Sequence, residues 1–206
     1  MKLEIRELDQ KDYQKAIKFA VKGMSFDRYG ENPAIINMYG KYFLYLELSK
    51  ATQVIAAYME DELVGLLLAE VYGESKIKQT LGQKLYIKAF GFLQSLYASG
   101  GLGTYEATNK DLLNIYKSKT QPDGEILFLA ANPDKKIKGV GTTLLKELEA
   151  REPGKEIFLY TDSGCTYQFY EHKGFILEGA RDIQLKIGKS KTDLTAMLFS
   201  KKLTQG

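Results

Sequence analysis

The sequence has 206 residues, 44% of them hydrophobic, so it can form one domain with a buried core and is not a disordered chain. Its 29 basic and 26 acidic residues leave a net charge of only +3, which gives no reason to expect a nucleic-acid partner. A single histidine, His172, and a single cysteine, Cys165, exclude an intramolecular disulfide and argue against a metal site. The chain contains 14 tyrosines, 10 phenylalanines and no tryptophan.

The first residues, 1–7, alternate charged and apolar side chains and lack the apolar core of a signal peptide. No segment approaches the run of about 18 apolar residues that a membrane-spanning helix needs. We therefore expect a soluble, cytoplasmic protein with no membrane partner.

The first third of the chain predicts three strands and two helices. Apolar residues alternate with charges over 2–8, recur at helical spacing over 13–23 and 35–50, and form β-rich runs over 52–59 and 63–72. The polar tripeptide Glu60-Asp61-Glu62 joins the last two runs and predicts a hairpin. The expected order is β, α, α, β, β.

The segment 76–119 interrupts this rhythm with two helical patterns. The first is marked by Leu81, Leu85, Phe92 and Leu96, and the second by Leu112, Leu113 and Tyr116. A glycine-rich stretch, 100–103, is expected to separate them. We interpret 76–119 as a helical insertion in a single domain that spans residues 1–206.

From Glu125 onward, strands and helices alternate again. The continuous apolar run 126–131 predicts a central strand buried on both faces. The elements expected after it are a helix over 142–150, a strand over 156–161, a short helix over 165–173 ending at Gly174, and two antiparallel strands over 175–187 and 193–202.

The loop 132–141, between a predicted strand and a predicted helix, is rich in glycine and lysine. A helix N-terminus exposes unpaired N–H groups and partial positive charge, and Gly139 and Gly141 would let a phosphate approach closely. Three lysines add formal charge: Lys135, Lys136 and Lys138. The Walker pattern is absent, and Leu144 stands where a dinucleotide fingerprint needs its third glycine. The loop alone leaves a pyrophosphate site and an ordinary glycine turn equally open.

Two motifs in sequence carry a family resemblance. The first is Lys136-x-x-Gly139-x-Gly141 after a strand and before a helix, and the second is Phe169-Tyr170-Glu171-His172-Lys173-Gly174-Phe175 after the next strand. Their order and separation resemble the GNAT superfamily of N-acetyltransferases, in which the first motif binds the pyrophosphate of acetyl coenzyme A. The resemblance implies an α/β (α+β) fold with a mixed, mostly antiparallel central sheet flanked by helices. It covers nearly the whole chain except the helical insertion expected after the third strand.

The resemblance also implies which residues bind acetyl coenzyme A (acetyl-CoA). The matching positions are Leu129, Ala130, Ala131, Lys136, Ile137, Lys138, Gly139, Val140, Gly141, Thr142 and Ser163. In the family, the backbone N–H at the position of Leu129 polarises the thioester carbonyl. Lys136 stands in place of the usual Arg or Gln and supplies charge without a bidentate fork, and Ser163 replaces a frequent Asn.

Acetyl transfer from a thioester to an amine needs a base, a hydrogen-bond donor for the oxyanion and an acid for the leaving thiolate. Glu125 matches the glutamate that acts as the base in several family members, and partial burial would raise its pKa. A solvated carboxylate at a strand end is an equally open interpretation. Tyr170 matches the tyrosine that protonates the thiolate. Cys165 and His172 lie two helical turns apart, so we do not expect them to form a dyad.

The resemblance thus implies an acetyl-CoA-dependent N-acetyltransferase whose acceptor is a primary amine of a small molecule or a protein. A non-catalytic acyl-CoA-binding sensor or interaction module is the alternative, because it would use the same loop. Several aromatic residues can line the acceptor site, pack the insertion or form a homodimer interface: Tyr29, Tyr39 to Tyr45, Tyr86, Phe90, Tyr97 and Tyr105.

Overall fold

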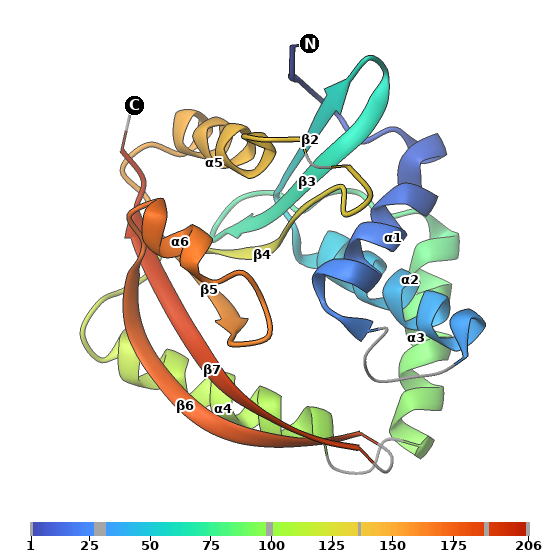
Figure 1. Cartoon of the computed structure of the whole chain (residues 1–206), viewed down its shortest axis with the longest axis vertical. Coiled ribbons are helices and arrows are strands. Elements are labelled where there is room, and N and C mark those ends of the chain that lie inside the picture. Colours follow the sequence, from blue (N-terminus) through green and yellow to red (C-terminus); the bar gives the residue numbers. More distant parts are fainter. Residues whose placement is uncertain (1, 27–31, 98–100, 136, 188–189, 205–206) are drawn as a thin grey trace.

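The structure is a computed structural model that describes residues 2–26, 32–97, 101–135, 137–187 and 190–204. Within these ranges one seven-stranded sheet runs through the molecule in the order β1-β2-β3-β4-β5-β7-β6 (Figure 1). Neighbouring strands are antiparallel except β4 and β5, which are parallel. The mixed, mostly antiparallel sheet flanked by helices is therefore confirmed.

The N-terminal elements follow the expected order. They are β1 (Glu4–Arg6), the short 3-10 helix η1 (Gln10–Asp12), α1 (Tyr13–Gly23), α2 (Pro33–Lys50), β2 (Gln53–Met59) and β3 (Glu62–Val71). Asn32 begins α2, because its side chain accepts hydrogen bonds from the first backbone N–H groups of the helix. Glu60 and Asp61 both have positive φ, as a two-residue hairpin turn requires, so Glu62 already belongs to β3.

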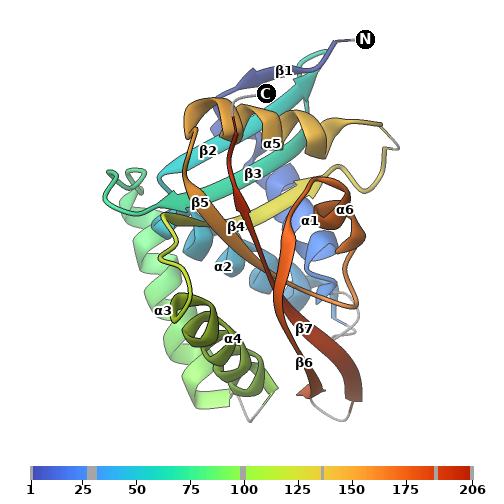
Figure 2. The same cartoon turned by 90° about the vertical axis from the view of Figure 1, so that its left-hand side faces the viewer.

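The two helices expected in the segment 76–119 are present as α3 (Leu81–Tyr97) and α4 (Gly101–Lys117). The glycine-rich stretch does not simply separate them, since Gly101 and Gly103 lie inside α4. The two helices cover different parts of the molecule. Helix α3 packs against α2, whereas α4 lies along the long β6–β7 hairpin (Figures 1 and 2).

The second half contains β4 (Gly124–Ala131), α5 (Val140–Arg151), β5 (Glu156–Asp162), α6 (Gln168–His172), β6 (Ile176–Ile187) and β7 (Ser190–Lys202). The prediction that the strand over 126–131 is buried on both faces is wrong. Ile126, Phe128 and Ala130 are buried, but Leu127 and Leu129 alternate with them and are partly exposed. The reason is that β5 leaves β4 after two residue pairs, so one side of β4 is uncovered.

Apolar side chains fill both faces of the sheet. Leu144 and Leu148 of α5 pack on one face, while Ile17 of α1 and Leu44 of α2 pack on the other. A third cluster joins Tyr116 of α4 to the strands β5, β6 and β7. In the described part of the chain, every helix is too short or too polar to cross a bilayer.

Candidate active site

The most unusual feature of the sheet is the separation of β4 from β5. The parallel pairing includes only Gly124 with Ile157 and Glu125 with Phe158. Beyond this point β4 continues beside β3 as far as Ala131, whereas β5 pairs with β7 along its whole length. Among the described strands, the C-terminal half of β4 therefore has a neighbour on one side only.

Within the described residues, this separation leaves some backbone N–H groups of β4 without a hydrogen-bond partner on a neighbouring strand. The N–H of Asn132 donates to the carbonyl of Val64 at 2.8 Å, so residue 132 faces β3. Since hydrogen bonding alternates along an antiparallel pair, Ala130 also faces β3, and Leu129 and Ala131 turn their N–H groups toward the gap. Leu129 and Ala131 thus present backbone donors where an extended ligand could take the place of the missing strand.

The predicted phosphate loop leads into the N-terminus of α5. Gly139 precedes the helix with φ at +86°, a conformation that favours glycine, and no side chain caps the helix. The first-turn N–H groups of Val140, Gly141 and Thr142 have no acceptor within a helix. They point toward an open end that carries partial positive charge.

The lysines of this loop have different surroundings. Lys138 is exposed beside the helix end, and Ile137 packs into the core under α5. Lys135 forms an ion pair with Glu62 at the start of β3, which holds the loop against the sheet. The prediction for Lys136 lies outside the described residues.

A glycine that the sequence interpretation overlooked lets α5 approach the sheet closely. A Cβ atom on Gly65 of β3 would lie 2.3 Å from Cγ1 of Val140 and 3.0 Å from Cδ1 of Leu144. Only a glycine leaves room for α5 at this height. Gly141 is crowded in the same way by Phe169 of α6, whose Cζ lies 2.9 Å from where a Cβ would stand. The N-terminus of α5 is therefore fixed between β3 and α6.

Tyr170 projects from α6 into an aromatic cluster beside this helix end. Its ring centroid lies 5.4 Å from Phe169, 5.6 Å from Phe175 and 6.4 Å from Phe199. Burial raises the pKa of the Tyr170 phenol above its usual range, so the group keeps its proton at neutral pH. A protonated phenol held by packed rings can act as a proton donor.

Cys165 and His172 are not brought together by the part of the structure that is described. Burial raises the pKa of the Cys165 thiol to about 11, with a further contribution from Asp162, so the thiol stays neutral. His172 is exposed at the end of α6.

Glu125 lies on β4 at the point where the pairing with β5 ends. Its cross-strand neighbours are Glu70 on β3 and Phe158 on β5, and its side chain is partly exposed. The pKa of Glu125 is raised to about 7, mainly by burial and then by the charge of Glu47, while Lys50 acts in the opposite direction. In the part of the chain that the structure describes, no hydrogen bond or ion pair engages this carboxylate.

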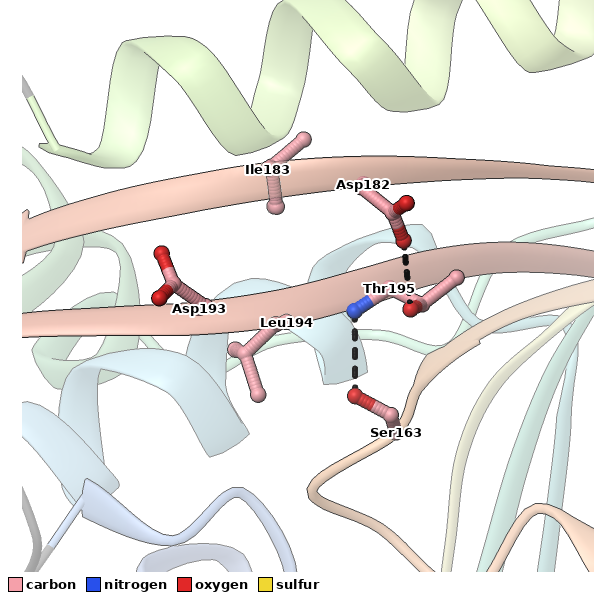
Figure 3. A pocket seen from close by; sticks show the side chains of 6 residues that line it. All are labelled: Ser163, Asp182, Ile183, Asp193, Leu194 and Thr195. Atoms are coloured by element: carbon pink, nitrogen blue, oxygen red, sulfur yellow. Dashed lines mark hydrogen bonds between the residues drawn. The ribbon is translucent and has the colours of Figure 1, made fainter.

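A hollow of about 410 Å³ lies beside the end of β5, between Ser163 and the β6–β7 hairpin (Figure 3). Ser163 lies at its edge, where its hydroxyl accepts a hydrogen bond from the N–H of Thr195 at 3.0 Å. Two carboxylates line the hollow and hold the β6–β7 hairpin: Asp182 accepts from the Thr195 hydroxyl at 2.7 Å, and Asp193 accepts from Gln184 at 2.9 Å. The Ser163 oxygen predicted to contact a ligand is thus already bound to β7, and its proton has no acceptor among the described residues.

Most of the aromatic residues considered for an acceptor site pack α3 onto α2. Phe90 lies 5.0 Å from Tyr39 and 4.8 Å from Tyr42, and Tyr86 lies 5.7 Å from Tyr45. Tyr105 differs, because its hydroxyl donates to Asp162 at the end of β5 at 3.1 Å. Tyr29 and the side chain of Tyr97 lie outside the described residues. Packing is therefore the role that the structure supports for Tyr39, Tyr42, Tyr45, Tyr86 and Phe90.

Comparisons with known proteins find structural similarity only. No family model and no curated protein matches the sequence. A yellow fever mosquito protein assigned as arylalkylamine N-acetyltransferase 7 is similar with a TM-score of 0.58 at 11% identity, over 98% of this chain and 87% of that one. The ribosomal-protein-S18-alanine N-acetyltransferase of Escherichia coli gives 0.54 at 13%, over 100% and 96%.

A GNAT-family acetyltransferase of Bacillus cereus is also similar over nearly its full length. Its TM-score is 0.50 at 10% identity, and the similarity covers 98% of both chains. These values define the architecture of this chain: it has the fold of the GNAT acetyltransferases. The resemblance inferred from the two motifs is confirmed at the level of the fold.

Proposed function

We propose that this protein is an acetyl-CoA-dependent N-acetyltransferase. The observation that carries the proposal is the gap between β4 and β5, which exposes the backbone donors of Leu129 and Ala131. Gly141, at the uncapped end of α5, lies next to the Leu129 side chain and to Phe169, the neighbour of Tyr170. An extended pantetheine arm would pair with β4 in the place that β5 leaves vacant. Its pyrophosphate would bind the N–H groups of Val140, Gly141 and Thr142.

In the proposed reaction, the thioester carbonyl accepts a hydrogen bond from the N–H of Leu129, which stabilises the oxyanion. Glu125 removes a proton from the acceptor ammonium. Four residues of strand span about 13 Å, so a water molecule relays this proton. The amine nitrogen forms a bond to the carbonyl carbon, the carbon–sulfur bond breaks, and Tyr170 gives its proton to the departing thiolate. The second proton of the attacking nitrogen passes to the Tyr170 phenolate, which leaves a neutral amide and restores the phenol. The products are the N-acetylated amine and coenzyme A.

The acceptor is proposed only as a primary amine. Among the similar structures, one is assigned to arylalkylamines and another to the alanine of a ribosomal protein, so small molecules and proteins both belong to the proposal. The hollow beside Ser163 and Thr195 provides an approach from the side of β7. The decisive assay measures thiol release from acetyl-CoA with a panel of small amines and amine-bearing peptides.

The binding half of the proposal is tested by Gly139→Val. Gly139 has φ at +86° and open space around it, so valine would distort the loop and obstruct the phosphates without clashing with the core. Gly73→Val is the matched control, since Gly73 has φ at +89° and is equally open but lies in the turn after β3. We expect Gly139→Val to weaken coenzyme A binding at least tenfold by calorimetry and Gly73→Val to leave it unchanged. Equal affinities in the two variants would refute the phosphate site.

The alternative, a non-catalytic acyl-CoA-binding module, predicts the same calorimetric result. It differs in the thiol-release assay, where it predicts no turnover with any amine. Glu125 favours the enzyme, because a carboxylate with a pKa near 7 is suited to proton transfer and contributes nothing to pyrophosphate binding.

A further inference from the structure

The outer face of α3 combines exposed apolar side chains with lysines. Leu81 is 78% exposed, and Leu85 and Phe92 are each 66% exposed. With Lys88, they recur every three or four residues, so they form one stripe along the helix. Figures 1 and 2 both show α3 at the periphery of the molecule.

The opposite face of α3 is occupied. Tyr86 and Phe90 point toward α2, where their rings pack against tyrosines, and Lys41 lies 4.5 Å from the centroid of the Tyr86 ring. A groove of about 320 Å³ follows the border between the two faces and is lined by Ser49, Gln79, Leu81, Lys84, Leu85, Ile87 and Lys88. The side chains of Leu81 and Leu85 therefore stay mostly exposed although α3 is packed against α2.

The charged residues in the sequence segment that contains α3 all have the same sign. Residues 75–105 contain four lysines, Lys76, Lys78, Lys84 and Lys88, and no acidic residue or arginine. Because the whole chain carries a net charge of +3, the rest of it is slightly acidic. Lys76 pairs with Glu70, but in the described part of the chain Lys78, Lys84 and Lys88 have no ion-pair partner. Three unpaired cations therefore flank the apolar stripe.

We propose that the outer face of α3 attaches the protein to an anionic lipid surface. Leucine and phenylalanine side chains on a helix flanked by lysines fit the boundary between headgroups and acyl chains, and anionic headgroups complement the lysines. The 17 residues of α3 span about 25 Å, so the helix can lie flat in that boundary. This attachment is peripheral, and it is independent of the acetyltransferase reaction.

A second copy of the chain fits this face less well. A twofold dimer brings the same patch of both molecules together, so the lysines of one copy would approach the lysines of the other. Like charges within such an interface oppose association. A lipid surface supplies the opposite charge along the whole stripe.

The test is flotation with vesicles of phosphatidylcholine alone and of phosphatidylcholine mixed with phosphatidylglycerol. We expect binding to the mixed vesicles only, with loss at high salt. Each lysine near an anionic surface contributes to the free energy of membrane binding. Removing two of them, by Lys84→Gln together with Lys88→Gln, should therefore weaken vesicle binding about 30-fold. The control pair, Lys18→Gln with Lys146→Gln, removes the same charge from exposed positions elsewhere and should leave binding nearly unchanged.

The apolar contribution is tested by Leu85→Glu, which should abolish binding. Its control is Ile176→Glu, because Ile176 is 65% exposed but lies on β6. Equal effects of the two substitutions, or no binding to anionic vesicles by the wild type, would overturn the proposal. So would a wild-type dimer in sedimentation experiments that Leu85→Glu dissociates, because the face would then be covered by a second copy. Circular dichroism checks that each variant is folded.

Discussion

The carboxylate of Glu125 should destabilise the protein at neutral and alkaline pH. Its pKa is raised from 4.5 to about 7, first by burial and then by Glu47 and Glu70. Between these two pH values the folded state holds a proton that the unfolded state has released, so this group lowers the free energy of unfolding as the pH rises. Below pH 4.5 Glu125 is protonated in both states, so it has no effect on the free energy of unfolding. Above pH 7 it is ionised in both states, and the full destabilisation is present.

The size of the effect follows from the same two values. A rise in pKa from 4.5 to about 7 corresponds to roughly 3 kcal/mol of unfolding free energy. Glu125→Gln removes the charge and keeps the shape of the side chain. The variant should therefore match the wild type near pH 4 and be more stable by roughly 3 kcal/mol at pH 8.

Urea unfolding monitored by circular dichroism at several pH values measures this difference. Glu106→Gln is the control, since Glu106 is exposed on α4 and its replacement removes the same charge from the surface. A gain in stability that is the same at pH 4 and pH 8, or the same in both variants, would refute the buried-carboxylate interpretation. The activity of Glu125→Gln provides a separate test of the proposed base, and we expect its kcat to fall about a hundredfold or more.

Two further substitutions test Tyr170 as the proton donor and the close packing of α5 on β3. Tyr170→Phe keeps the ring packing on Phe175, so it should leave coenzyme A affinity and stability nearly unchanged. It should slow thiol release about a hundredfold, because the proton donor is lost. A rate equal to that of the wild type would exclude Tyr170 as the acid. Gly65→Ala places a Cβ 2.3 Å from Cγ1 of Val140, so it should cost about 1–3 kcal/mol of unfolding free energy and weaken coenzyme A binding by displacing α5. Thermal unfolding and calorimetry measure both effects, and an unchanged variant would show that α5 has room to shift.

The strands and helices could be read from the sequence because local patterns determine them. The β-rich run 63–72 and the helical spacing of 13–23 and 35–50 all depend on neighbouring residues. The burial of β4, in contrast, depends on residues that are distant in the sequence. An apolar run such as 126–131 suits a strand with two neighbours, and the departure of β5 toward β7 is a tertiary event that this run does not encode.

The candidate site shows the same division between local and distant causes. Gly139 was identifiable, because a glycine before a helix is a local signal that its left-handed conformation explains. Gly65 carried no such signal, since its role depends on Val140, which lies 75 residues later and fills the space above it. The aromatic residues of α2 and α3 were ambiguous for the same reason: only their contacts distinguish packing from a ligand wall.

The energetics of Glu125 bear directly on the choice between an enzyme and a binding module. A protein that only bound acetyl-CoA would use the β4 backbone and the end of α5, and neither needs a carboxylate at position 125. Glutamine at this position would be more stable above pH 7 by roughly 3 kcal/mol, a large part of the stability of an ordinary domain. Lys50 and Lys117 lie near enough to moderate this cost, yet neither forms an ion pair with Glu125 in the described structure. A group that is costly to the fold, poised near neutral pH and left without a partner is what a general base requires, and a binding site alone gives no reason for it.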